Sequence, residues 1–181
     1  MRTFEFVSDY EAKGFTPTLP QYQTRFAAAA DFYAAQDVVI PSIWRDFAKN
    51  VYLSVFNKSG KMNIYKKQEK IFDISPTLVH TGIKANMGED EVLEIYTRSS
   101  NPKKLGLVLA NSVGVIDADY YGNPENDGEI MFAFYNFKVT DVVIKAGTRI
   151  GQGMFKKVLR PEIGLSIKDS KRDGGFGSTD K

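Results

Sequence analysis

Asn111-Ser-Val-Gly-Val-Ile-Asp-Ala-Asp-Tyr-Tyr-Gly122 is the stretch of sequence from which the fold can best be predicted. Apolar Val115 and Ile116 favour a strand, and the following Asp117-Ala-Asp119 favours a turn, so two short strands bent back on each other are expected. A hairpin tip of this kind places a carboxylate, backbone N–H and C=O groups and an aromatic face close together. That combination suits a small nucleotide site, although the same residues are also typical of a surface turn with two solvated carboxylates.

The composition is that of an ordinary globular chain. Its 181 residues suit one domain with a core and an extension, and a net charge of +2 is too small to indicate direct nucleic-acid binding. The absence of cysteine excludes disulfides and thiolate metal sites and is compatible with the cytoplasm. A single histidine, His80, makes a histidine-rich zinc site or a Ser-His-Asp triad hard to build. We find no membrane-spanning apolar run and no signal peptide.

Short apolar segments separated by turns dominate the rest of the chain. The expected strands lie within 2–7, 71–84, 92–97, 105–110, 131–136, 142–144 and 149–159. About ten such strands predict an all-β fold, an antiparallel jelly-roll or β-barrel. Residues 1–159 are expected to form this core, and the glycine-rich residues 160–181 a mobile C-terminal arm.

Residues 42–70 differ in character and are predicted to be an insertion. Trp44, Phe47 and Val51 recur at helical spacing, Ser42 is a suitable N-cap, and the segment from Lys61 is rich in lysine. Two interpretations remain open. The helix packs on the core with a solvated lysine face, or the insertion binds a protein partner.

Five short motifs follow one another in a fixed order. They are Ala30-Asp31, Arg98-Ser99-Ser100, Gly114-Val-Ile-Asp-Ala-Asp-Tyr-Tyr-Gly122, Gly147-Thr-Arg-Ile-Gly-Gln152 and Arg172-Asp-Gly-Gly-Phe-Gly-Ser-Thr179. Each is weak by itself, but in this order the set resembles the trimeric dUTPases (deoxyuridine triphosphate nucleotidohydrolases), and their Gram-positive bacterial and phage branch most of all. The resemblance implies an all-β jelly-roll or barrel of the trimeric dUTPase type, with a short helical insertion.

Several of these residues have side chains or backbones suited to a triphosphate. Arginines form charge-assisted bonds to phosphate, hydroxyls donate to its oxygens, and glycines let backbone amides wrap around it. The candidate phosphate-binding residues are Arg98, Ser99, Ser100, Arg172, Gly175, Gly177, Ser178 and Thr179. Phe176, an aromatic residue between glycines, suits stacking on a flat base, and the resemblance places it on uracil.

The resemblance also assigns roles within the hairpin. Asp117 corresponds to the general base that activates the water attacking the α-phosphorus, and Tyr120 to the residue that packs on deoxyribose and excludes UTP. Backbone groups at Asn111, Gly114, Val115 and Ile116 correspond to those that pair with the uracil edge. Asp119 is expected to be structural.

The remaining implied features concern the metal and the assembly. Asp31 corresponds to a carboxylate near Mg²⁺ that acts through water, and Gln152 to an amide that contacts phosphate or positions water. Three subunits would form a homotrimer with shared sites, and the arm of one subunit would cover a site built by the others. The implied reaction hydrolyses dUTP to dUMP and pyrophosphate, which keeps uracil out of DNA and supplies dUMP for dTMP synthesis.

Three departures from the family pattern leave details open. The spacing after Arg172 is one residue shorter, so Lys171 is a second candidate for its role. Ala29 replaces a family glycine, and Asn-Pro-Glu-Asn-Asp127 is an additional loop. Two other functions on the same fold also remain open: a dCTP deaminase, and a regulatory protein that senses dUTP.

Overall fold

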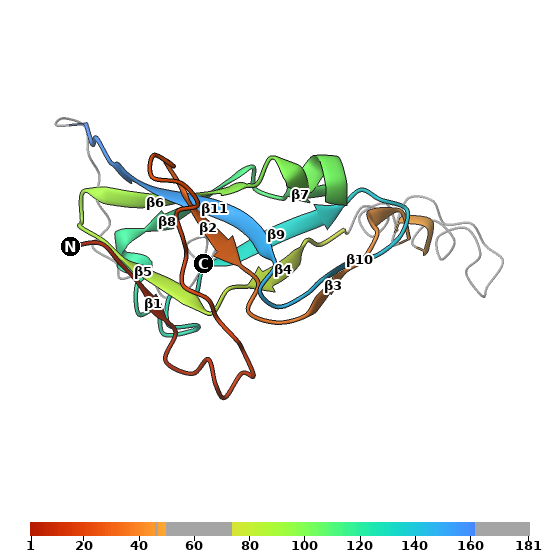
Figure 1. The fold of residues 1–181 in the computed structure, drawn as a ribbon, viewed down its shortest axis with the longest axis horizontal. Helices are drawn as coiled ribbons and strands as arrows, with labels where there is room; N and C mark the ends of the chain where they lie inside the picture. The colour runs from red at the N-terminus through yellow and green to blue at the C-terminus, as the bar shows by residue number, and fades with distance from the viewer. Residues whose placement is uncertain (46, 50–73, 162–181) are drawn as a thin grey trace, which may run out of the picture.

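The structure, a computed structural model, describes residues 1–45, 47–49 and 74–161, and strands make up most of the regular secondary structure within them (Figure 1). Eleven strands are formed: β1 (Thr3–Phe6), β2 (Ala30–Tyr33), β3 (Val38–Ile40), β4 (Thr77–His80), β5 (Ile83–Asn86), β6 (Glu91–Thr97), β7 (Leu107–Leu109), β8 (Val113–Asp117), β9 (Met131–Asn136), β10 (Val142–Ile144) and β11 (Arg149–Lys157). Two short helical segments, η2 (Asn101–Leu105) and η3 (Ala118–Tyr120), lie between strands in the second half of the chain. The predicted all-β fold is therefore confirmed.

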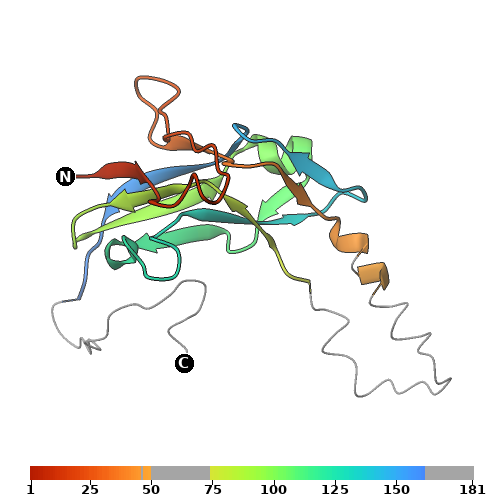
Figure 2. The ribbon, with the colours of Figure 1, turned by 90° about the horizontal axis from the view of Figure 1, so that it is seen from below.

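The strands form four antiparallel sheets. Their orders are β2-β11-β6-β8, β4-β9-β7, β1-β5 and β10-β3. Figure 2 shows the sheets as layers seen nearly edge-on, with the β3–β10 ribbon extending from one end. The sheets do not close into a barrel, so the jelly-roll alternative describes the fold better.

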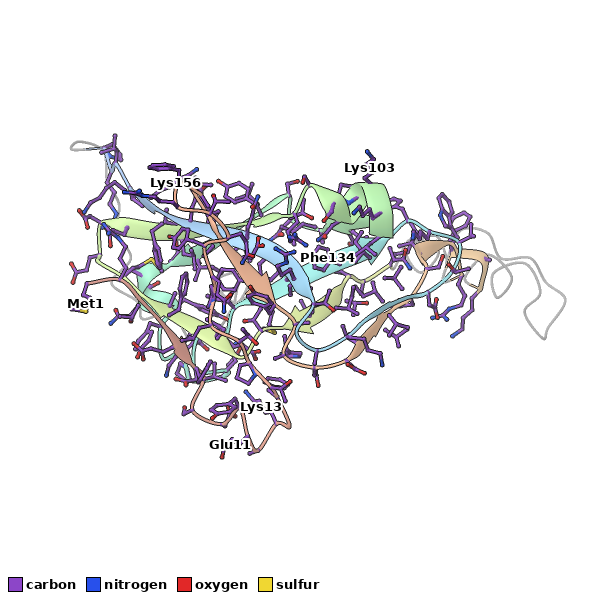
Figure 3. All side chains as sticks on the ribbon, viewed as in Figure 1. Met1, Glu11, Lys13, Lys103, Phe134 and Lys156 are labelled. Carbon is purple, nitrogen blue, oxygen red and sulfur yellow. The ribbon has the colours of Figure 1, made fainter. Side chains whose placement is uncertain are left out.

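Aromatic side chains fill the space between the sheets. The ring of Phe32 lies 5.3 Å from Phe4 and 5.6 Å from Phe132, and Phe132 stacks on Phe134 at 6.2 Å. Figure 3 shows Phe134 inside the molecule, whereas the labelled lysines, such as Lys103, point outward. Gly151 is required here, because a Cβ at that position would lie 1.9 Å from the ring of Phe132.

The predicted hairpin at Asp117–Asp119 is wrong. β8 ends at Asp117 as predicted, but a 3-10 turn, η3, and a loop follow it instead of a second strand. β8 pairs with β6, which comes before it in the sequence. The returning chain does not pair with β8 because residues 121–128 bond to η3 and to one another, with Asn123 N–H donating to the carbonyl of Tyr120.

The start of the predicted insertion is helical. Residues 43–45 and 47–49 are helical, and the Ser42 hydroxyl accepts a hydrogen bond from the backbone N–H of Trp44 at 3.2 Å, as expected of an N-cap. The rest of the insertion and nearly all of the predicted arm lie outside the described residues. In the described part of the chain, no helix has the length and apolar character needed to cross a membrane.

Glu91 begins β6 and ties the N-terminus to the end of the sheet. Its buried carboxylate accepts a hydrogen bond from Arg2 Nε at 2.8 Å and one from the backbone N–H of Gly88 at 3.0 Å. These bonds, the one from Arg2 above all, lower the pKa of Glu91 from 4.5 to about 2.

The lowered pKa of Glu91 predicts a specific loss of stability in acid. The contribution is present above pH 4.5 and disappears as the pH falls toward about 2, because the folded state then has to take up a proton that the unfolded state already holds. Glu91→Gln should therefore lower the melting temperature at pH 7, and the difference from the wild type should vanish near pH 2. Thermal unfolding across this range checks it, with Glu89→Gln, an exposed neighbour, as the control. A constant difference at every pH would contradict the assignment.

Candidate active site

Three of the five motifs converge on the outer face of the four-stranded sheet. Gly151 and Gly153 of β11 face Phe132 and Phe32 in the core. Because side chains alternate along a strand, Gln152 between them faces outward. Its register partner on β2 is Asp31, which therefore lies beside it on the same face.

Asp31 lies between two arginines. Its carboxylate accepts a hydrogen bond from Arg149 Nη1 at 3.2 Å, and its other oxygen is 3.6 Å from Nε of Arg98. Arg98 follows the last residue of β6 and donates from Nη1 to the carbonyl of Arg149 at 3.3 Å. One largely buried carboxylate thus fixes two guanidinium groups whose remaining N–H donors are available to an anionic ligand.

These residues line an open cleft of about 290 Å³. Its lining is Gln23, Thr24, Ala27, Ala29, Asp31, Arg98, Ser99, Arg149 and Gln152. Four of the predicted site residues therefore share one cleft. Arg149 was not among them, although the motif that ends in Gln152 contains it, and an arginine at the start of an outward-facing strand was a usable signal. Gln23 was also missed, and it accepts a hydrogen bond from Arg149 at 3.1 Å.

The serines after Arg98 lead into η2, as predicted for a short helical turn. Ser100 is the N-cap of η2, and Pro102 stands in its first turn. The buried Asn101 donates from Nδ2 to the carbonyl of Ile150 at 2.6 Å, which fixes the turn against β11. Ser99 is thereby held on the rim of the cleft, and Ser100 next to it.

The predicted uracil-binding segment forms the edge strand β8. Gly114 lies against Ile95 so closely that a Cβ would be 2.4 Å from Ile95 Cγ1, and the Asn111 amide lies near the same point. Ile116 packs against the core, whereas Val115 is exposed. The backbone of β8 has β6 on one side only, so its other edge is open among the described residues.

Asp117 lies at the far end of the sheet from Asp31. It lines a second cleft, of about 680 Å³, with Met87, Glu89, Glu91, Ala118, Asp119, Val158 and Arg160. Asp119 is exposed on this cleft, and Tyr120 is only 6% exposed in η3. Within the described residues, no cluster of three or more acidic or histidine side chains forms a metal site.

The two clefts are too far apart to act on one substrate within a single chain. Asp31 aligns with Gln152 and Tyr96, and Asp117 aligns with Val92 and Lys156. Asp31 and Asp117 are separated by three strand spacings across the sheet and by four residues along the strands. Together these place their backbone positions about 20 Å apart. A general base acts within hydrogen-bond reach or through one water. If Asp117 has the general-base role that the resemblance implies, a second copy of the chain would have to bring its Asp117 to the arginine cleft.

The arm motif lies outside the described residues. Arg172, Gly175, Phe176, Gly177, Ser178 and Thr179 therefore stay predictions from sequence, as does the alternative role of Lys171.

The protein is all-β, and the outer face of its four-stranded sheet carries a cleft lined by two arginines, whose chemistry suits an anionic ligand. The family model described as dUTPase matches residues 65–180 of the chain. The chain belongs to the dUTPase family. The structure thus agrees with the class to which the five motifs pointed.

Relatives and solved structures agree with this assignment. The deoxyuridine 5'-triphosphate nucleotidohydrolase of Lactococcus lactis subsp. lactis (strain IL1403) is 38% identical over 179 residues, which cover 99% of this chain and 97% of that one. The crystal structure of dUTPase from Streptococcus mutans aligns with a TM-score of 0.65 and 36% identity, over 88% of this chain and 98% of that one. A dUTPase from phage phi11 of S. aureus, in which a structural Mg(II) ion is coordinated, shares the fold with a TM-score of 0.60 at 13% identity, over 93% of this chain and 98% of that one.

Proposed function

We propose that the chain hydrolyses dUTP to dUMP and pyrophosphate, by attack of water on the α-phosphorus, in a site shared between copies of the chain. The observation that carries this proposal is the cleft in which Arg98, Arg149 and Gln152 surround Asp31. Family membership supplies the substrate, and the cleft has the chemistry that a triphosphate requires. Removing uracil nucleotides from the DNA precursor pool is the role that follows.

The arginine cleft is the proposed triphosphate site. Arg98 and Arg149 present donors in a fixed orientation because Asp31 holds both, so little conformational freedom is lost when phosphate binds. The side chain of Gln152, on the same face, reaches phosphate oxygens or the attacking water. The hydroxyls of Ser99 and Ser100 lie at the cleft and beside it.

Asp117 of a second copy is the proposed general base. A carboxylate is a weak base, so orientation of the water and neutralisation of phosphate charge must supply much of the rate. The backbone of the edge strand β8, around Gly114 to Ile116, is the proposed reader of the uracil edge. Tyr120 then lies next to Asp117, where the sugar of the same nucleotide would be.

Magnesium fits this site only as a companion of the substrate. The Asp31 carboxylate is already shared by two arginines, and the described residues offer no cluster of acidic ligands. Mg²⁺ keeps several waters and binds readily to phosphate oxygens, so Asp31 would contact it through water. When bound, the ion neutralises charge on the triphosphate.

A homotrimer is the proposed assembly. Dividing the site between copies explains why two essential-looking groups lie about 20 Å apart on one sheet. The arm, residues 160–181, would complete the site, and the core would be residues 1–159. A protein partner at 42–70 and a cytoplasmic location remain predictions.

Substrate comparison tests the proposal. Pyrophosphate release should be fast with dUTP and weak with dTTP, UTP and dCTP. Ammonia release from dCTP without pyrophosphate from dUTP would instead identify a deaminase. Tight dUTP binding without turnover would identify a sensing protein, and either outcome would overturn the proposed function.

A further inference from the structure

The loop of residues 121–128, which follows η3, folds tightly back onto Tyr120. The carbonyl of Tyr120 accepts a hydrogen bond from Asn123 N–H at 3.2 Å. At the other end of the loop, a Cβ on Gly128 would lie 2.5 Å from the same carbonyl, which is closer than any side chain allows. Glycine at position 128 therefore lets the loop pack directly against the backbone of Tyr120.

Asn126 in this loop holds the hydroxyl of Tyr120. Its Nδ2 donates to the Tyr120 hydroxyl at 2.7 Å, and its Oδ1 accepts from the backbone N–H of Gly128 at 3.1 Å. The second bond orients the amide so that Nδ2 faces the ring. Tyr120 is thus held at both its backbone and the tip of its side chain.

Asp127 fastens the loop to the rest of the molecule. Its Oδ2 accepts from the backbone N–H of Ser8 at 2.8 Å, from the Ser8 hydroxyl at 2.7 Å and from Lys84 Nζ at 2.8 Å. Lys84 belongs to β5, in a different sheet from β8. Asp127 therefore ties the loop to β5 and to the N-terminal segment, whereas Asn126 makes the contact with the Tyr120 side chain.

We infer that Asn126 is a positioning residue for sugar selectivity. By holding the Tyr120 hydroxyl, it keeps the ring fixed where it would clash with the 2′-hydroxyl of a ribonucleotide. This inference rests on the proposed function, in which Tyr120 packs on deoxyribose. Steric exclusion of one oxygen works only when the excluding group cannot yield, because a shift of about an ångström admits the larger sugar. Asn126 does not touch the substrate and acts through Tyr120.

The test compares kcat/KM for dUTP and for UTP in matched variants. Asn126→Ala should lower the dUTP-to-UTP ratio about five- to tenfold, the effect expected from loss of one hydrogen bond, mainly through faster UTP turnover. Tyr120→Phe, which removes the hydroxyl and keeps the ring, should lower the ratio by the same factor. The double variant should lower it no further than Tyr120→Phe alone, since both changes remove the hydrogen bond between Asn126 and Tyr120.

Two further variants separate positioning from general loosening of the loop. Asn126→Asp should preserve the ratio, because a carboxylate accepts from the Tyr120 hydroxyl and still accepts from Gly128 N–H. Asp127→Asn weakens the anchor to Lys84 and leaves the Asn126 amide in place, so it should also preserve the ratio. Melting temperatures verify that each variant is folded, and Tyr120→Phe carries the test if Asn126→Ala does not fold.

The possible outcomes separate a failure of this inference from a failure of the proposed function. Normal dUTP turnover with an unchanged ratio in Asn126→Ala and Tyr120→Phe would overturn the inference alone. An equal loss of selectivity in Asp127→Asn would also overturn it, because the effect would then be one of loop stability. Absence of dUTP turnover in the wild-type chain would refute the proposed function and this inference with it.

Discussion

Asp117→Asn is expected to abolish turnover of dUTP while leaving its binding intact. The amide has the size of the carboxylate but cannot accept a proton from water, and general-base catalysis contributes about 10² to 10⁴ to a rate. Since the arginine cleft would hold the phosphates and Asp117 would contact only the attacking water, affinity should change less than about threefold. Single-turnover kinetics and calorimetry with a non-hydrolysable dUTP analogue measure the two quantities.

Asp119→Asn is the matched control for Asp117→Asn. Asp119 is exposed, lies two residues further along, and faces the same cleft of about 680 Å³. Removing its charge changes the local field by a similar amount without removing the proposed base. A comparable loss of turnover in both variants, or near-normal turnover in Asp117→Asn, would refute the assignment of Asp117.

Mixed assemblies of two inactive variants should regain activity. Arg98→Ala removes a phosphate-binding group from one cleft, and Asp117→Asn removes the base from the other. If a site takes Arg98 from one copy and Asp117 from another, then about one site in four of a random 1:1 assembly contains both intact residues. Pyrophosphate release from the co-refolded mixture should therefore reach about a quarter of the wild-type rate.

The matched control for this mixing experiment pairs Asp117→Asn with Asp117→Ala. Both variants lack the same group, so no arrangement of copies restores it, and the mixture should stay inactive. Recovery in that control would indicate contamination or an unrelated assembly effect. If the Arg98→Ala and Asp117→Asn mixture showed no recovery although mixed trimers had formed, both residues would have to act within one chain, and the shared site would be wrong.

The sequence predicted the strands well because their signal is local. Strands such as β6 and β9 are predicted from alternating apolar residues and flanking turn residues. These signals come from residues only a few positions apart in the sequence. The hairpin predicted after β8 was wrong because strand pairing is not a local feature of the sequence. Its turn residues were recognised, but the strand that pairs with β8 is β6, and no local pattern specifies that partner.

The candidate site shows the same division. Asp31, Arg98 and Gln152 were found by motif, whereas the contact of both arginines with one carboxylate depends on the register between β2 and β11. Arg149 was overlooked although the motif that ends in Gln152 contains it, because its contact with Asp31 depends on how β11 pairs with β2. The same holds for Asn126, whose role is visible only where the loop returns to Tyr120.

Because β11 and β6 separate the two clefts, the activity of this protein should depend on its concentration. Under the proposed function, a chain in which Asp117 cannot reach the arginine cleft is inactive by itself, however well it folds. Specific activity should therefore collapse below the concentration at which copies separate, and an inactive copy should disable neighbours that are themselves intact. Dilution should therefore abolish activity without unfolding the chain.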